Sequence, residues 1–190
     1  MIILETPRLT VRNWRDDDRD LFREINADAK VMEFFAQRRS HAEADAMMDK
    51  VRRLITETGY GFFAVELQET GEAIGFCGLA PANIEPVLPE DTIEIGWRMA
   101  TRFWGNGYMT EAALSLLDYA FAEKKLDEVV SFAVAGNLRS RAVMKRIGMV
   151  HDESADFDHP RVPDSHPHLQ RHVLYRIAAA AHRPVAAARS

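Results

Sequence analysis

The stretch "TIEIGWRMATRFWGNGYMTEAALSLL", residues 92–117, joins a strand-like pattern to a helix-like one through two glycines. Apolar residues alternate over 92–99 and recur at helical spacing beyond the glycines. Gly105 and Gly107 therefore stand in a loop that leads into a helix, where unpaired backbone N–H groups can bind an anion. The pattern Arg102-x-x-Gly105-x-Gly107 is neither a P-loop nor a dinucleotide-binding motif, so spacing alone leaves a phosphate site and a plain tight turn open.

Strands and helices are predicted on both sides of this stretch. The expected strands are residues 8–14, 60–67, 73–80, 92–99, 128–135 and 169–177, and the expected helices lie within 15–28, 40–59 and 137–149 and from residue 108 onward. Ser40 and Glu43 form a capping-box pattern, and Gly59 is a C-cap. The strand–helix–strand–helix order after residue 92 implies a right-handed crossover and local parallel pairing. We expect one domain, residues 1–177, and an alanine-rich, disordered tail, residues 178–190.

Composition narrows the classes of function. The net charge of -5 makes a polyanion an unfavourable partner, so we expect no nucleic acid. The one cysteine, Cys77, excludes an internal disulfide and a cysteine-based zinc site, which suits a reducing compartment, and it is expected to be a buried small hydrophobe. No signal peptide or membrane-length apolar run is apparent, so a cytoplasmic protein without a membrane partner is expected.

The residues 92–121, followed by "NLRSRAVMKRIGM" at 137–149, resemble the GCN5-related N-acetyltransferase (GNAT) family in its ribosomal-protein acetyltransferase-like (RimJ/RimL) branch. The resemblance follows the element order over residues 5–177. It implies an α/β fold with a GNAT-type mixed, twisted and splayed central sheet of six or seven strands and helices on both faces. It also implies an acetyl-CoA-dependent N-acetyltransferase acting by direct transfer to a primary amine, either a protein N-terminus or a small-molecule amine. A non-catalytic acyl-CoA-binding regulatory domain is the alternative.

The resemblance also implies where acetyl-CoA binds. In the family the glycine loop holds the pyrophosphate, and the pantetheine arm lies between the strands that correspond to 92–99 and 128–135. A backbone N–H near Trp97 is the implied oxyanion donor. Asn137 is expected to contact the arm, and it also suits a helix N-cap. The implied cofactor-binding residues are Trp97, Met99, Arg102, Gly105, Asn106, Gly107, Tyr108, Met109, Thr110 and Asn137. Arg139, Arg141 and Lys145 either reach the 3′-phosphate or face solvent.

Two side chains are implied catalysts. Glu94 is placed to accept the amine proton through a water, although a solvated or salt-bridged strand residue is an equal interpretation. Glu90 and Asp91 are weaker alternatives. Many family members carry a tyrosine acid where this sequence has Met144, which cannot donate a proton. That departure leaves Ser140, or a water, to protonate the thiolate, and a small packing residue is the other interpretation of Ser140.

A histidine-rich segment precedes the last predicted strand. "DFDHPRVPDSHPHLQRH", residues 156–172, lacks the helical His-x-x-x-His spacing of a zincin, and its prolines favour an extended loop. We therefore expect no metal. In the family this region helps to form the acceptor site, so Asp158 and His159 are predicted to bind substrate. The expected partners are acetyl-CoA and an amine acceptor, with a homodimer left open.

Overall fold

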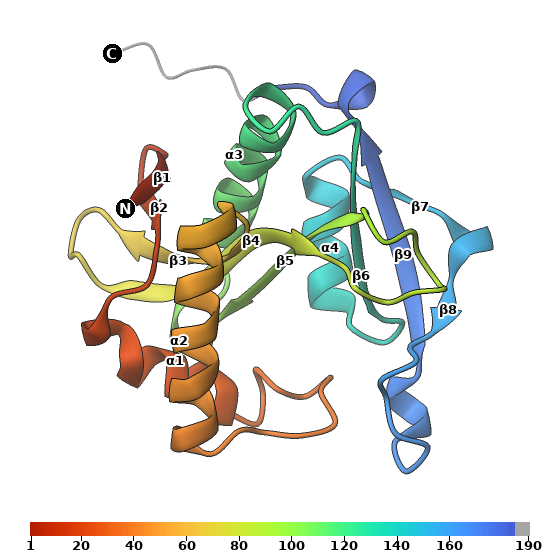
Figure 1. Cartoon of the computed structure of the whole chain (residues 1–190), viewed down its shortest axis with the longest axis horizontal. Coiled ribbons are helices and arrows are strands. Elements are labelled where there is room, and N and C mark those ends of the chain that lie inside the picture. The colour runs from red at the N-terminus through yellow and green to blue at the C-terminus, as the bar shows by residue number, and fades with distance from the viewer. Residues whose placement is uncertain (185–190) are drawn as a thin grey trace.

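One mixed sheet organises the chain in a computed structural model that describes residues 1–184, and helices cover both faces of the sheet (Figure 1). The helices are α1 (Arg19–Ala27), α2 (His41–Thr58), α3 (Tyr108–Ala122) and α4 (Leu138–Arg146). The strands are β1 (Ile2–Glu5), β2 (Leu9–Arg12), β3 (Gly61–Leu67), β4 (Ala73–Pro81), β5 (Ile93–Met99), β6 (Glu128–Val134), β7 (Val150–His151), β8 (Phe157–Asp158) and β9 (Arg171–Ala178). Their order is β1-β2-β3-β4-β5-β6-β9-β7, and β8 also pairs with β9.

The predicted α/β class with a splayed sheet is confirmed, but the sheet has nine strands in place of the expected six or seven. The additional strands are β1, β7 and β8. β1 is an edge strand in which Ile2 is exposed, and β7 and β8 have two residues each, so none of the three has a readable alternation of buried and exposed positions. The last predicted strand begins two residues late, because Pro167–Leu169 forms a 3-10 turn.

The sheet opens between β5 and β6. These parallel strands have seven residues each, yet they pair at a single position, Glu94 opposite Val130. Elsewhere β5 pairs along its whole length with β4, and β6 does so with β9. Figure 1 shows the result, with β4 and β5 crossing the molecule while β6 and β9 run steeply beside them. The local parallel pairing that we predicted exists, and the strands then separate.

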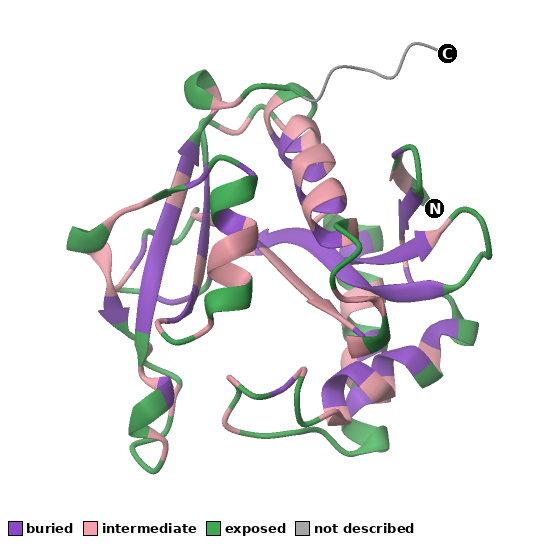
Figure 2. Cartoon of the chain, turned by 180° about the vertical axis from the view of Figure 1, so that it is seen from behind, coloured by how far each residue is buried: buried purple, intermediate pink, exposed green. Residues whose placement is uncertain are grey.

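The largest core extends over both faces of the sheet, and α3 covers it on the face opposite α1 and α2. Leu116, Leu117 and Ala113 of α3 are fully buried with Ile95 of β5 and Ile74 of β4. Figure 2 shows buried residues along the central strands and the inner side of the helices. The amphipathic pattern of α3 therefore fixes the helix that follows the glycine loop against β4 and β5.

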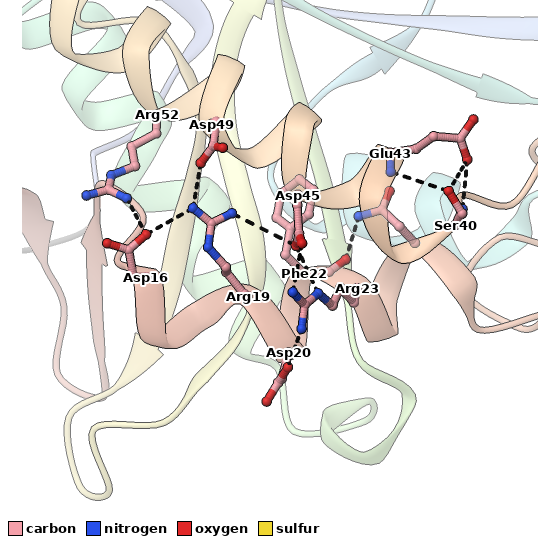
Figure 3. Close-up of polar contacts among 11 residues, drawn as sticks. Asp16, Arg19, Asp20, Phe22, Arg23, Ser40, Glu43, Asp45, Asp49 and Arg52 are labelled. Carbon is pink, nitrogen blue, oxygen red and sulfur yellow. Dashed lines mark hydrogen bonds and ion pairs between the residues drawn. The ribbon is translucent and has the colours of Figure 1, made fainter.

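A network of charges holds α1 against α2 (Figure 3). Arg19 pairs with Asp49 at 2.7 Å, and Arg23 pairs with Asp45 at 2.7 Å. Single exposed ion pairs contribute little, but a network that bridges two helices restrains their relative position. The predicted capping box of α2 is confirmed, because Ser40 N donates to Glu43 at 2.8 Å and Glu43 N donates to Ser40 Oγ at 3.3 Å.

The described part of the predicted tail contacts the domain. Ala178 ends β9, Ala179–Ala181 form a 3-10 turn, and His182 pairs with Asp118 of α3 at 2.5 Å. Residues 185–190 of that tail lie outside the described residues. Over residues 1–184, none of the helices has the length and apolar character that crossing a membrane requires.

Candidate active site

The glycine loop between β5 and α3 presents free backbone donors. Gly105 and Gly107 have φ angles of +84° and +78°, a left-handed conformation that side chains disfavour. Backbone N–H groups of residues 105–110 donate to none of the described residues. A Cβ atom on Gly105 would meet no protein atom within 4 Å, and one on Gly107 would meet only Arg8 Nη2 at 3.7 Å. The space that the glycines leave clear therefore lies outside the protein, beside donors that suit a diphosphate.

Side chains of the loop and of the N-terminal segment hold this conformation. The Trp104 indole donates to the Met99 carbonyl at 2.8 Å, which anchors the loop to the end of β5. The Asn106 side chain turns inward and donates to the Phe103 carbonyl at 3.1 Å. Arg8, which sequence reasoning did not single out, donates to the Asn106 carbonyl at 3.1 Å and lies over the Tyr108 ring.

Two charged side chains near the loop, Glu111 and Arg102, form ion pairs with residues outside the loop. Glu111, in the first turn of α3, accepts from Thr6 Oγ1 at 2.6 Å and pairs with Arg8 at 2.6 Å. Its negative charge is thus held at the N-terminal segment. Arg102 pairs with Glu24 and, at 3.1 Å, with Glu72. The free donors that face the open side of the loop are accordingly the backbone N–H groups.

The edge of β5 that faces β6 is open to a ligand. Ser131 of β6 donates its hydroxyl to the Ile95 carbonyl at 2.8 Å, so the backbone groups of Ile95 point toward β6. Because backbone groups alternate in direction along a strand, those of Trp97 and Met99 point the same way. The Met99 carbonyl already accepts a hydrogen bond from the Trp104 indole, whereas the backbone groups of Trp97 face the widening gap. Ser131 is a buried polar residue in an otherwise apolar strand. A serine in such a strand is a sequence signal for a hydrogen-bonding role, and we missed it.

Glu94 lies where β5 and β6 last touch. It is partly exposed, and its carboxylate forms no hydrogen bond or ion pair with the described residues. Burial raises the pKa of Glu94 to about 8, while the positive charge of Arg161 acts in the opposite direction. Glu94 is thus neither fully solvated nor salt-bridged, and its carboxyl group can exchange a proton near neutral pH. Glu90 and Asp91, the weaker alternatives, are both exposed.

α4 begins shortly after β6, the strand on the other side of the gap from β5. The Asn137 side chain accepts from Ser140 N at 3.1 Å, so the predicted N-cap is confirmed. Ser140 is partly exposed, and its hydroxyl forms no hydrogen bond with the described residues. Met144, one turn further on, is 1% exposed, which places Ser140 on the inward side of α4.

The three predicted contacts to a 3′-phosphate have different surroundings. Arg139 pairs with Glu33 at 2.6 Å and lies over the Trp104 ring at 4.7 Å. Arg141 donates to the Ala135 carbonyl at 2.9 Å. The side chain of Lys145 is exposed and forms no hydrogen bond or ion pair with the described residues. Arg139 therefore links the α1–α2 loop, α4 and the glycine loop.

The predicted acceptor segment forms an aromatic cluster on β6, β8 and β9. The rings of His159 and His172 are 4.7 Å apart, and those of Phe157 and His172 are 5.6 Å apart. Burial, helped by His172 and Arg161, lowers the pKa of His159 to about 4, so its imidazole is neutral near pH 7. Asp158 points to the surface, 3.6 Å from Arg171. Over residues 1–184, no three His, Cys, Asp or Glu side chains gather as metal ligands.

Comparisons with known proteins agree with this geometry. The acetyltransferase (GNAT) domain family matches residues 8–150. YkkB of Bacillus subtilis (strain 168) is 34% identical over 149 residues, which are 77% of this chain and 84% of that protein. The FsC-acetyl coenzyme A-N(2)-transacetylase of Aspergillus fumigatus is 32% identical over 157 residues, 80% of this chain and 66% of that protein. YdaF of Bacillus subtilis, named provisionally as a ribosomal N-acetyltransferase, is 44% identical over 62 residues, 33% of this chain and 34% of that protein.

The fold matches as well. The crystal structure of a GNAT-family acetyltransferase from Bacillus anthracis superimposes with a TM-score of 0.78 at 23% identity, covering 95% of this chain and 99% of that one. The chain therefore belongs to the GNAT acetyltransferase family. It is an N-acetyltransferase, and the family uses acetyl-CoA as the acetyl donor.

Proposed function

We propose that this protein transfers an acetyl group directly from acetyl-CoA to a primary amine, and that it belongs to the RimJ/RimL branch. One observation carries the proposal: the free N–H groups of residues 105–110 adjoin a gap in the sheet where Glu94 has no partner. The segment from Asn137 to Met144 and the similarity to YdaF support the branch.

On the donor side, the backbone does most of the binding. The N–H groups of residues 105–110 hold the diphosphate at the positive end of α3. The Trp97 backbone faces the pantetheine arm and donates its N–H to the charge that develops on the thioester oxygen. Asn137 fixes the first turn of α4 beside the same arm. Arg102 contributes to the diphosphate site only after leaving Glu24 and Glu72.

On the acceptor side, two protons must move. The acceptor arrives as an ammonium, and Glu94 takes its first proton through a water, which leaves a nucleophilic amine. As the amine nitrogen bonds to the carbonyl carbon, the C–S bond breaks. The second nitrogen proton passes through Ser140, or a water beside it, to the departing sulfur. The products are an N-acetylated amine, CoA thiol and protonated Glu94.

A covalent acetyl-cysteine is not part of this scheme. Cys77, the single cysteine, lies in β4 with no exposed surface. Burial raises the pKa of its thiol, whereas a nucleophilic cysteine needs a lowered one. We also propose that Asp158 and His159 contact the acceptor, and that the enzyme acts in the cytoplasm without metal, membrane or nucleic acid. A homodimer is compatible with the scheme.

CoA and acetyl-CoA are expected to raise the melting temperature, because a ligand that binds only the native state stabilises it. ATP and NAD carry phosphates but no pantetheine arm, so they are expected to raise it far less. Differential scanning fluorimetry with the four ligands at equal concentration tests this. An equal response to all four would indicate a general anion site, and CoA binding without turnover of any amine would favour the non-catalytic alternative.

A further inference from the structure

Arg98 is a cation on β5 that forms no ion pair with any carboxylate in the part of the chain that the structure describes. It lies on the same face of the strand as Glu94, because side chains alternate between faces. Its Nη1 donates to the side-chain Oδ1 of Asn26 at 2.6 Å, and its Nε is buried without a partner among residues 1–184. Its Nη2 forms no hydrogen bond with the described residues and, unlike Nε, is not completely buried.

The surroundings hold this guanidinium in one orientation. It lies between the ring of Phe35, 4.3 Å away in the α1–α2 loop, and the ring of Phe76, 5.3 Å away in β4. The amide of Asn26 is itself oriented, because its Nδ2 donates to the Phe22 carbonyl at 2.7 Å. A charged side chain that two rings and an oriented amide fix in place is arranged for recognition.

Arg12 is a buried arginine with a structural role, and it provides a comparison for Arg98. Arg12 is 2% exposed and pairs with Asp18 and Glu66, each at 2.7 Å. A buried guanidinium without such partners is costly. Arg98 lacks them, and burial lowers its pKa to about 10. An anionic ligand would supply the missing partner.

The neighbourhood adds positive charge. The positive charge of Arg39 reaches Arg98 as well as Glu43, and that of Arg161 reaches Glu94, and neither arginine forms an ion pair in direct contact with a described carboxylate. Because the pKa of Glu94 is raised to about 8, its carboxyl group is mostly neutral near pH 7. This face of the sheet is thus locally positive in a chain whose net charge is -5.

We propose that the acceptor amine carries a carboxylate and that Arg98 binds this carboxylate through its free Nη2. Arg98 is the sequence neighbour of Trp97, so the carboxylate site adjoins the position proposed for the reacting carbonyl. The acceptor is therefore an amino acid or a short peptide and not a polyamine, which would meet like charges here. The inference rests on the proposed function and narrows its substrate class.

The test compares acceptors in matched pairs. Each standard amino acid, and a set of dipeptides, is assayed beside its C-terminal amide, with spermidine as a polyamine probe, by following CoA thiol release. An amide group makes the neighbouring amine less basic, so more of it is unprotonated at neutral pH. Preference for the free acid therefore cannot come from amine reactivity. We expect kcat/KM to be at least about tenfold higher for the free acid of each accepted pair.

Variants then assign the preference to Arg98. Arg98→Met keeps an apolar chain between Phe35 and Phe76, and it is expected to lower kcat/KM for the free acid about 30-fold, mainly through KM. Values for the amide and the melting shift with CoA are expected to stay the same. Arg98→Lys should recover part of the loss, and Arg53→Met, an exposed arginine on α2, should cause none.

The outcomes separate this inference from the proposed function. Equal use of acids and amides, a preference for spermidine, or an equal loss for both members of a pair in Arg98→Met would overturn the role of Arg98 and leave acetyl transfer intact. Failure of the wild type to acetylate any amine would overturn the proposed function, and the inference with it.

Discussion

Replacing Gly107 with valine is expected to lower the affinity for CoA by at least about 100-fold, the loss of two hydrogen bonds to a charged group. Gly107 has a φ of +78°, and the backbone N–H groups on both sides of it have no partner within residues 1–184. A branched side chain would occupy the space that the diphosphate needs and would strain the loop. Isothermal titration calorimetry with CoA measures the effect.

The chain offers a matched control for strain. Gly148, which follows α4, has a φ of +85°, and a Cβ there would meet Ile177 at 3.7 Å, the same spacing as Gly107 to Arg8. Gly107→Ala and Gly148→Ala should therefore lose similar stability. Only Gly107→Ala should lose CoA affinity. If both variants bind CoA like the wild type, the loop does not hold the diphosphate.

Glu94→Gln is expected to lower kcat about 100-fold, the low end of what a general base contributes. Glutamine keeps the shape of the side chain but cannot accept the proton. Because the pKa of Glu94 is about 8, wild-type kcat/KM should rise as pH increases toward that value. The deficit of the variant should shrink at higher pH, where free amine is abundant. Steady-state kinetics across pH with one good acceptor measures both effects.

The raised pKa of Glu94 can be checked without activity. The unfolded chain loses this proton near 4.5 and the native protein near 8, so between these values the native state binds more protons and its stability falls as pH rises. The Glu94→Gln variant does not bind this proton, so it does not show this fall in stability. Its melting temperature relative to the wild type should increase from about pH 5 to about pH 8. Glu90→Gln, at an exposed position, should show no such trend, and its kcat should match the wild type.

Local patterns predicted the parts of the site that depend on neighbouring residues. The glycine spacing indicated an open loop before a helix, and the loop has free N–H groups. Trp104 stands next to Gly105, and its indole donates to a carbonyl five residues earlier. Asn137 indicated an N-cap, and it caps α4. Each of these interactions joins residues within one turn or loop, so short spacings determine them.

Local sequence patterns could not predict the contacts between distant segments of the chain. The sequence of the motif gives no sign that Arg102 has a partner, but folding brings it to Glu24, 78 residues away in the chain. The isolation of Arg98 is visible only once α1, β4 and the α1–α2 loop surround it. Ser131 reaches Ile95 across the opening of the sheet. The charges that shape the acceptor side therefore depend on tertiary structure and not on local propensity.

Direct transfer is the central claim, and rapid mixing tests it. Enzyme at a concentration close to that of acetyl-CoA is mixed with it, with and without a good acceptor, and CoA thiol is followed through the first turnover. Direct transfer predicts no release of thiol until the amine is present, and then release equal to the acetylated amine formed. A stoichiometric burst of thiol without any amine would show an acetyl-enzyme and contradict direct transfer.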